Sequence, residues 1–173
     1  MRTIKGDLIE NEYKIITPFR MLISGSSGTG KTTFIEKLLK SDRINIEFST
    51  IYYCYPYSLG EPPVDWHVTL NVNVEYLTKL PDLKFFDTVE PNSLLILDDL
   101  WSETCNSRDL VAAFKVYSRK KEVSIIIVTQ SYFSGGEEGR EIKNNMSYHA
   151  SQSCITLTVS NHKIHVLSEM VKG

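Results

Sequence analysis

The chain has 173 residues, a net charge of −2 and 23% charged side chains. This length suffices for one ordinary domain that buries roughly 70% of its extended surface, and it is too short for two such domains. The charge balance excludes the composition of disordered chains and of basic nucleic-acid coats, so any contact with nucleic acid has to be local. No apolar segment has the length that crosses a bilayer, and the N-terminus lacks the apolar core of a signal peptide.

The three cysteines lie far apart, without the spacing of a metal or redox motif. Such cysteines are typical of reduced, packed thiols in a cytosolic or nuclear protein. We therefore expect a soluble intracellular protein that is not secreted, with one domain over residues 1–173 and an N-terminal extension over 1–18.

The clearest motif is Gly-Ser-Ser-Gly-Thr-Gly-Lys-Thr at residues 25–32, which fits the phosphate-binding P-loop pattern. An apolar run at 19–24 precedes it, and apolar residues at helical spacing follow it, so the sequence predicts a strand, a loop and a helix. The glycines let backbone N–H groups curl around nucleotide phosphates, and the helix N-terminus adds partial positive charge. A glycine-rich turn that binds nothing is the alternative interpretation.

The P-loop pattern also assigns roles to single residues. Lys31 is expected to reach the β- and γ-phosphates of ATP, and the Thr32 hydroxyl is expected to ligate Mg²⁺. The residues expected to contact ATP are Gly25, Ser26, Ser27, Gly28, Thr29, Gly30, Lys31, Thr32 and Thr33.

The segment after the P-loop helix predicts three more elements. β-branched and aromatic residues at 49–55 predict a second strand, whose tyrosines are more simply packing residues than part of a nucleotide pocket. A short third strand is expected at 66–70, and a short helix at 74–80, closed by Pro81.

Two aspartates follow the apolar run 94–97, which predicts a strand buried on both faces of a parallel sheet. Ligands bind at the carboxyl edge of such sheets, so the pair has the form of a Walker B element. Asp98 would hold Mg²⁺ directly or through water, and Asp99 would polarise the attacking water. Aspartates that cap the following turn are the alternative.

A second apolar strand at 124–128 delivers Thr129 and Gln130 to the same edge. If this strand lies between the P-loop strand and the acidic strand, Gln130 can hydrogen-bond both the attacking water and the γ-phosphate, as a sensor. An edge amide with ordinary partners is the alternative.

Other segments are predicted from local pattern. Ser107 is expected to cap a helix with an apolar stripe. The glycine-rich segment 134–140 is expected to form a loop, and Arg140 at its end to act as an arginine finger for a neighbouring subunit or as an ordinary surface arginine. Alternation over 154–159 and 163–167 predicts a hairpin that turns at Asn161.

Taken together, the chain resembles the additional-strand P-loop ATPases of the FtsK–HerA superfamily, and most closely the viral genome-packaging ATPases of the poxvirus, Polinton and virophage type. The resemblance rests on 25–32, on 94–100, and on 125–133 followed by Arg140 and by Asn144 or Asn145. It implies an α/β fold with three layers and a mostly parallel central sheet.

By this resemblance Lys31 and Thr32 bind nucleotide and metal, Asp98 is the Walker B aspartate, Asp99 holds the catalytic acid position and Gln130 is the sensor. The family implies a ring, often hexameric, in which ATP hydrolysis moves double-stranded DNA into a capsid, with a capsid or portal protein as a further partner. Such a protein works in the virion or in the host cytoplasm or nucleus. The chain departs from the family at Asp99, where many relatives carry Glu, and over the atypical strands of 150–173.

Two other functions stay open from the residues alone. A nucleotide-binding switch would keep the P-loop but hardly turn over ATP. A small-molecule kinase would need lid arginines, for which Arg140 is the one candidate in a glycine-rich segment.

Overall fold

The computed structural model describes residues 14–62, 64–130, 136–151, 154–159 and 162–166. Its strands are β1 (Arg20–Ser24), β2 (Thr50–Cys54), β3 (Asn73–Leu77), β4 (Leu94–Asp98), β5 (Ser124–Thr129), β6 (Tyr148–Ser151), β7 (Cys154–Val159) and β8 (His162–Val166). They form one sheet in the order β3-β2-β4-β5-β1-β6-β7-β8. The strands from β3 to β6 run parallel, and β7 and β8 continue the sheet antiparallel.

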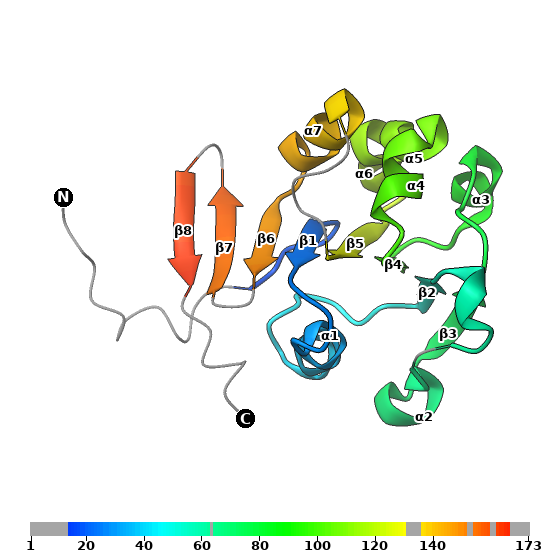
Figure 1. Cartoon of the computed structure of the whole chain (residues 1–173). Helices are drawn as coiled ribbons and strands as arrows, with labels where there is room; N and C mark the ends of the chain where they lie inside the picture. The colour runs from blue at the N-terminus through cyan, green and yellow to red at the C-terminus, as the bar shows by residue number, and fades with distance from the viewer. Residues whose placement is uncertain (1–13, 63, 131–135, 152–153, 160–161, 167–173) are drawn as a thin grey trace.

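Helices cover both faces of the sheet, which makes three layers (Figure 1). One face carries α1 (Lys31–Lys40) and α2 (Trp66–Leu70). The other carries α3 (Leu83–Thr88), α4 (Trp101–Asn106), α5 (Arg108–Ala112), a π-helical turn at Ala113–Tyr117, α6 (Ser118–Lys120) and α7 (Gly136–Asn144). A 3₁₀ turn at Tyr57–Leu59 follows β2. The expected α/β class with a mostly parallel sheet is thus confirmed.

The central strands are apolar because they are covered on both faces. Every residue of β5 is buried, and the four apolar residues of β4 have no exposed surface. Parallel strands in this position lack the polar alternation of a half-exposed sheet. This burial confirms the two strands predicted from 94–97 and 124–128.

β5 lies between β1 and β4, so the sheet has an extra strand between the P-loop strand and the acidic strand. Ser24 pairs with Thr129, and Asp98 pairs with Val128. The carboxyl ends of the three strands are therefore level, at one edge of the sheet.

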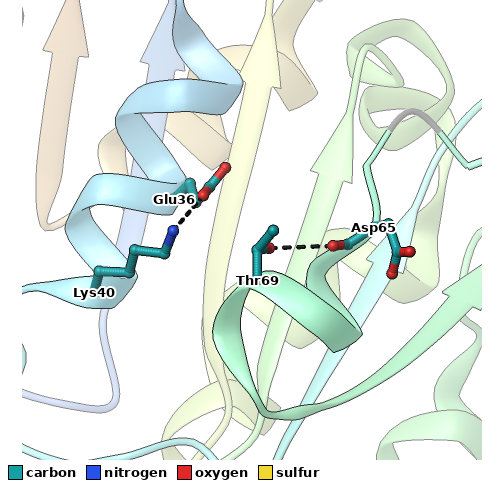
Figure 2. Close-up of polar contacts among 4 residues, drawn as sticks. All are labelled: Glu36, Lys40, Asp65 and Thr69. Carbon is teal, nitrogen blue, oxygen red and sulfur yellow. Dashed lines mark hydrogen bonds and ion pairs between the residues drawn. The ribbon is translucent and has the colours of Figure 1, made fainter.

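α1 and α2 contact each other on their common face. Figure 2 shows a polar contact across one turn at each helix: Lys40 with Glu36 in α1 at 2.6 Å, and Thr69 of α2 with the carbonyl of Asp65, the N-cap of α2, at 3.1 Å. Phe34, Ile35 and Leu38 bury the apolar stripe of α1 against the sheet, which confirms the helix predicted after the P-loop.

The predicted order of strand and helix over 66–80 is wrong. Residues 66–70 form α2 and residues 73–77 form β3, which pairs parallel with β2. In α2 Trp66 is the single buried residue, whereas β3 places Val74 in the core between two exposed neighbours. The loop predicted over 134–140 is wrong from Gly136 onward, where α7 begins; the two residues before it lie outside the described part.

Other local predictions are confirmed. Ser107 caps α5 by accepting a hydrogen bond from the Leu110 N–H. β7 and β8 form the predicted hairpin, although Asn161 itself is outside the described residues. β6, which joins this hairpin to β1, is a strand that the sequence analysis did not predict.

The described thiols are packing residues, as expected. Cys54 and Cys105 are buried and free. Burial raises the pKa of Cys54 to about 12 and that of Cys105 to about 11, so neither thiol ionises near neutral pH. No helix in the described ranges combines the length and apolarity that crossing a membrane requires.

Candidate active site

The P-loop connects the end of β1 to the start of α1. Gly28 and Gly30 have φ angles of +75° and +80°, in the left-handed region that residues with a Cβ avoid. Gly30 is the N-cap of α1; no side chain caps this end, and the first turn carries no acidic residue. The backbone N–H groups of this turn are therefore open to an anion.

The Lys31 ammonium group lies against the P-loop backbone. Its Nζ donates hydrogen bonds to the carbonyl oxygens of Gly25 and Ser26, both at 2.8 Å. Thr29 Oγ1 donates to the same Ser26 oxygen at 2.8 Å. The motif thus carries its positive charge beside the backbone that would surround a phosphate.

The end of β5 is bonded to both the P-loop and the acidic pair. The Gly25 N–H donates to the Thr129 carbonyl at 3.1 Å, and the Asp99 N–H donates to the Val128 carbonyl at 3.0 Å. The structure therefore brings the phosphate-binding motif and the two aspartates to one edge, as the sequence predicts.

Asp98 is half-buried at the end of β4, and the phenol of Tyr53 donates a hydrogen bond to its Oδ2. Burial raises the pKa of Asp98, and the charge of Asp99 adds to this rise, while the Tyr53 hydrogen bond and the Lys31 ammonium oppose it. The pKa of Tyr53 is raised by its own burial and by the adjacent Asp98 carboxylate, so Tyr53 stays a protonated donor.

Asp99 differs from Asp98 in backbone and in partners. It is exposed and has a φ of +55°, in the left-handed region that Asp enters more readily than most residues. Gln130, which follows β5, donates from Nε2 to Asp99 Oδ2 at 3.1 Å. The candidate sensor and the candidate catalytic acid are therefore in direct contact, at a backbone geometry of the kind that clusters at functional sites.

The residues expected to hold Mg²⁺ offer a suitable donor set. Asp98 contributes a carboxylate of which one oxygen is bonded to Tyr53. The Thr32 hydroxyl, half-buried in the first turn of α1, has no hydrogen-bond partner within the described ranges. A carboxylate and a free hydroxyl are hard oxygen ligands, and Mg²⁺ keeps waters in its remaining positions.

Arg140 is exposed on α7, which lies on the face of the sheet opposite α1 (Figure 1). In the described ranges no arginine makes a hydrogen bond or ion pair with the P-loop or with either aspartate. The structure does not bring Arg140 to the other candidate residues of the same chain.

Tyr53 is a polar contact of the site that the sequence analysis did not find. Its ring does pack in the core, as expected for the tyrosines of β2, but its hydroxyl reaches Asp98. The available signal was a phenol near the carboxyl end of a fully buried strand, level with the strand that ends in Asp98. That signal becomes readable only when β2 and β4 are known to be neighbours.

The sheet order and the strand–P-loop–helix unit define the class of protein as a P-loop NTPase with an additional strand. Two solved structures share this fold at a TM-score of 0.50. One is the genome packaging NTPase B204 from Sulfolobus turreted icosahedral virus 2 in complex with AMP, 14% identical, where the match covers 77% of this chain and 74% of that chain. The other is described as the ATPase domain of a second protein, 10% identical, where the match covers 87% of this chain and 79% of that chain.

The flagellar accessory protein FlaH from Methanocaldococcus jannaschii is also similar, at 15% identity and a TM-score of 0.49, with 91% of this chain and 81% of that chain covered. No curated protein matches the sequence. The family model of the poxvirus A32 protein matches residues 10–171. The chain therefore belongs to the poxvirus A32 protein family, and it is a P-loop ATPase, which confirms the resemblance to FtsK–HerA-type enzymes.

Proposed function

We propose that this protein is a Mg²⁺-dependent ATPase whose hydrolysis cycle drives double-stranded DNA translocation during viral genome packaging. Membership of the poxvirus A32 family and the sequence motifs shared with packaging ATPases support the proposal. The structural likeness to an NTPase described as a genome packaging enzyme is consistent with it.

The observation that carries the hydrolytic part of the proposal is the contact between Gln130 and Asp99 beside the P-loop. Gln130 Nε2 lies 3.1 Å from Asp99 Oδ2, and both residues follow strand ends that are level with the end of β1. An exposed carboxylate that an amide donor holds in place can accept a proton from the attacking water. The same amide can report whether a γ-phosphate is present.

The P-loop supplies the binding half of the site. Lys31 would exchange its bonds to the Gly25 and Ser26 carbonyls for the β- and γ-phosphate oxygens of ATP. The N–H groups of the first turn of α1, including those of Thr32 and Thr33, would hold the same phosphates. Positioning of this kind, with charge stabilisation, supplies most of phosphoryl-transfer catalysis.

Thr32 and Asp98 would hold Mg²⁺. Bound there, the cation would neutralise negative charge on the β- and γ-phosphates. Asp98 is suited to this role because it ends β4 at the same edge as the P-loop and keeps one carboxylate oxygen without a bond to Tyr53.

Assembly of several copies would complete the site. The candidate arginine, Arg140, is exposed on α7 and makes no described contact with its own P-loop, which suits a residue that acts on a neighbouring copy. An arginine supplied in this way contributes on the order of 10³–10⁵ in rate, so a lone subunit should hydrolyse ATP slowly. A homo-oligomeric ring on DNA, docked to a capsid or portal protein, would use this dependence.

The test is ATP turnover of the full chain over a wide range of protein concentrations, with and without double-stranded DNA. We expect specific activity to rise steeply with concentration and to rise again when DNA is added. Flat specific activity through the assembly range would contradict an arginine supplied by a neighbour. Tight ATP binding without turnover under any condition would contradict the motor and leave a nucleotide-binding switch.

A further inference from the structure

Tyr53 contacts Asp98, one of the two candidate aspartates, from the buried interior of the sheet. It lies on β2, next to β4 in the sheet, and its side chain is 1% exposed. Its hydroxyl donates to Asp98 Oδ2, across 45 residues of sequence. Tyr53 therefore touches the carboxylate without being at the surface where a nucleotide would bind.

The ring of Tyr53 is held by an aromatic cluster, which consists of Tyr53, Tyr55, Trp66 and Tyr76. The ring centroid of Tyr53 lies 5.2 Å from Trp66 at right angles, 6.2 Å from Tyr76 and 6.4 Å from Tyr55. The contacts with Trp66 and Tyr76 are edge-to-face, a geometry that is favourable beyond the area that it buries. The ring of Tyr53 is therefore fixed from several sides, by residues of α2 and β3 and by Tyr55, which follows β2.

Hydrogen bonds fix the cluster itself. Tyr76 Oη donates to the Val64 carbonyl at 2.8 Å and accepts from the Trp66 N–H at 3.3 Å. Both bonds go to backbone and neither goes to Asp98. Tyr53 and Tyr76 thus belong to one cluster, Tyr53 buried and Tyr76 partly buried. Tyr53 is bonded to the Asp98 carboxylate, and Tyr76 is bonded to backbone.

The hydroxyl of Tyr53 restricts the Asp98 carboxylate. A carboxylate on a short side chain can rotate about its last bond, and a donor fixed on one oxygen removes that freedom. Oδ2 is then engaged and Oδ1 is left for a cation. Partners of this kind orient metal ligands, and their removal typically weakens metal affinity 10- to 100-fold.

We propose that Tyr53 is the positioning residue for the cation-binding carboxylate: the aromatic cluster holds its phenol on Oδ2 of Asp98 and so presents Oδ1 to Mg²⁺. The inference rests on the proposed role of Asp98 and Thr32 in binding Mg²⁺. It extends the site to α2 and β3, which contribute no residue of the P-loop or of the acidic pair. Tyr53 itself touches neither nucleotide nor cation.

The experiment compares the wild-type chain with Tyr53→Phe and with Tyr76→Phe as the matched control. Each variant removes one hydroxyl from the same cluster and keeps the ring. Affinity for a non-hydrolysable β,γ-methylene ATP analogue is measured in EDTA, and Mn²⁺ affinity of the protein–analogue complex is measured from the electron paramagnetic resonance signal of free Mn²⁺. Thermal unfolding checks the fold, and Tyr53→Met replaces Tyr53→Phe if the latter fails to fold.

We expect Tyr53→Phe to weaken Mn²⁺ binding about 10- to 100-fold and to leave analogue binding in EDTA within about twofold of wild type. Tyr76→Phe should leave both affinities within about twofold. In turnover assays Tyr53→Phe should raise the Mg²⁺ concentration for half-maximal rate and largely keep kcat at saturating Mg²⁺, which a merely structural role would not do.

Wild-type Mn²⁺ affinity in Tyr53→Phe, or equal weakening in both phenylalanine variants, would overturn the inference and leave the proposed function standing. Loss of analogue affinity in EDTA would assign Tyr53 to packing and would also overturn it. A wild-type chain that binds the analogue but no Mn²⁺ would overturn the proposed cation site itself, and the inference with it.

Discussion

The two halves of the candidate site are built in different ways. In the P-loop half, the bonds that hold the motif are local: Lys31 bonds to carbonyls five and six residues away. In the acidic half, Gln130 is 31 residues from Asp99, and Tyr53 is 45 residues from Asp98. The P-loop is thus a property of one short segment, whereas the acidic half exists only where β2, β4 and β5 lie side by side.

The end of β5 joins the two halves, because its last carbonyls accept hydrogen bonds from Gly25 and from Asp99. Substitutions in the two halves can therefore be compared directly, because both halves are held by the same strand end. Changes in the P-loop half should weaken nucleotide binding as well as hydrolysis, whereas changes in the acidic half should lower hydrolysis and leave nucleotide affinity nearly unchanged.

Among substitutions in the P-loop half, Lys31→Ala should have the largest effect, because it removes the one ammonium group of the motif. We expect kcat to fall about 10²–10³-fold, with weaker ATP binding. Turnover and calorimetric binding measure both effects. The control is Lys40→Ala at the other end of α1, where an exposed ion pair with Glu36 contributes little (Figure 2). Equal loss in both variants would show that the effect is one of general charge or stability.

Gln130→Ala changes the acidic half and leaves the P-loop intact. Asp99 would lose its amide donor, so we expect kcat to fall roughly 10- to 100-fold while ATP affinity stays within about twofold. The control is Asn106→Ala, an exposed amide that bonds within its own helix. A large loss of ATP affinity in Gln130→Ala would contradict the expectation that the acidic half affects hydrolysis and not nucleotide affinity.

Gly30→Ala tests the local geometry of the P-loop. The φ of +80° is strained for alanine, although a Cβ at this position would meet no atom within 4 Å. We expect a loss of about 1–2 kcal/mol in folding free energy, together with weaker ATP binding. Gly60→Ala is the control, since Gly60 has a similar φ of +76° and the same open space, outside the site. It should lose similar stability and keep ATP affinity; loss of affinity in both would contradict a local effect.

Asp98→Asn should have the smallest effect, and it should raise the stability of the fold instead of lowering it. Burial raises the pKa of Asp98 in the folded state. Between the ordinary carboxyl pKa of about 4 and this raised value the folded protein binds more protons than the unfolded one, so the fold loses stability as pH rises through that window. Without nucleotide or divalent cation, Asp98→Asn should therefore unfold a few degrees higher, by about 2–4 °C per kcal/mol, at neutral pH. This gain should shrink toward pH 4. A variant less stable than wild type at neutral pH would contradict it.

The sequence predicts the P-loop half well because the residues that define it lie close together along the chain. Gly-x-x-x-x-Gly-Lys-Thr, the preceding apolar run and the helical stripe of α1 lie within some twenty residues of chain. The apolar stretches 94–97 of β4 and 125–128 of β5 were also readable, because residues buried on both faces of a sheet are apolar without alternation. The positions of Asp98, Asp99 and Gln130 at one edge followed from those runs.

The elements that were wrong or missed depend on tertiary contacts. Over 66–80 two short segments have similar composition, and the packing of Trp66 against Tyr53 and the pairing of β3 with β2 decide which is helix and which is strand. Val74 is flanked by the polar residues Asn73 and Glu75, a pattern that indicates a strand. Pro81 favoured the wrong prediction, because it was interpreted as the end of a helix. The Tyr53–Asp98 bond needed the order of strands in the sheet, which no local pattern contains.

The most direct test of the central claim is Asp99→Asn, in which ATP binding and a single round of hydrolysis are measured on the same preparation. We expect affinity to stay within about twofold and hydrolysis to fall about 10²–10⁴-fold, because the carboxylate acts on water and not on the phosphates. Unchanged hydrolysis, or hydrolysis lost in step with binding, would contradict the claim that Asp99 and the end of β5 form the catalytic half of this ATPase.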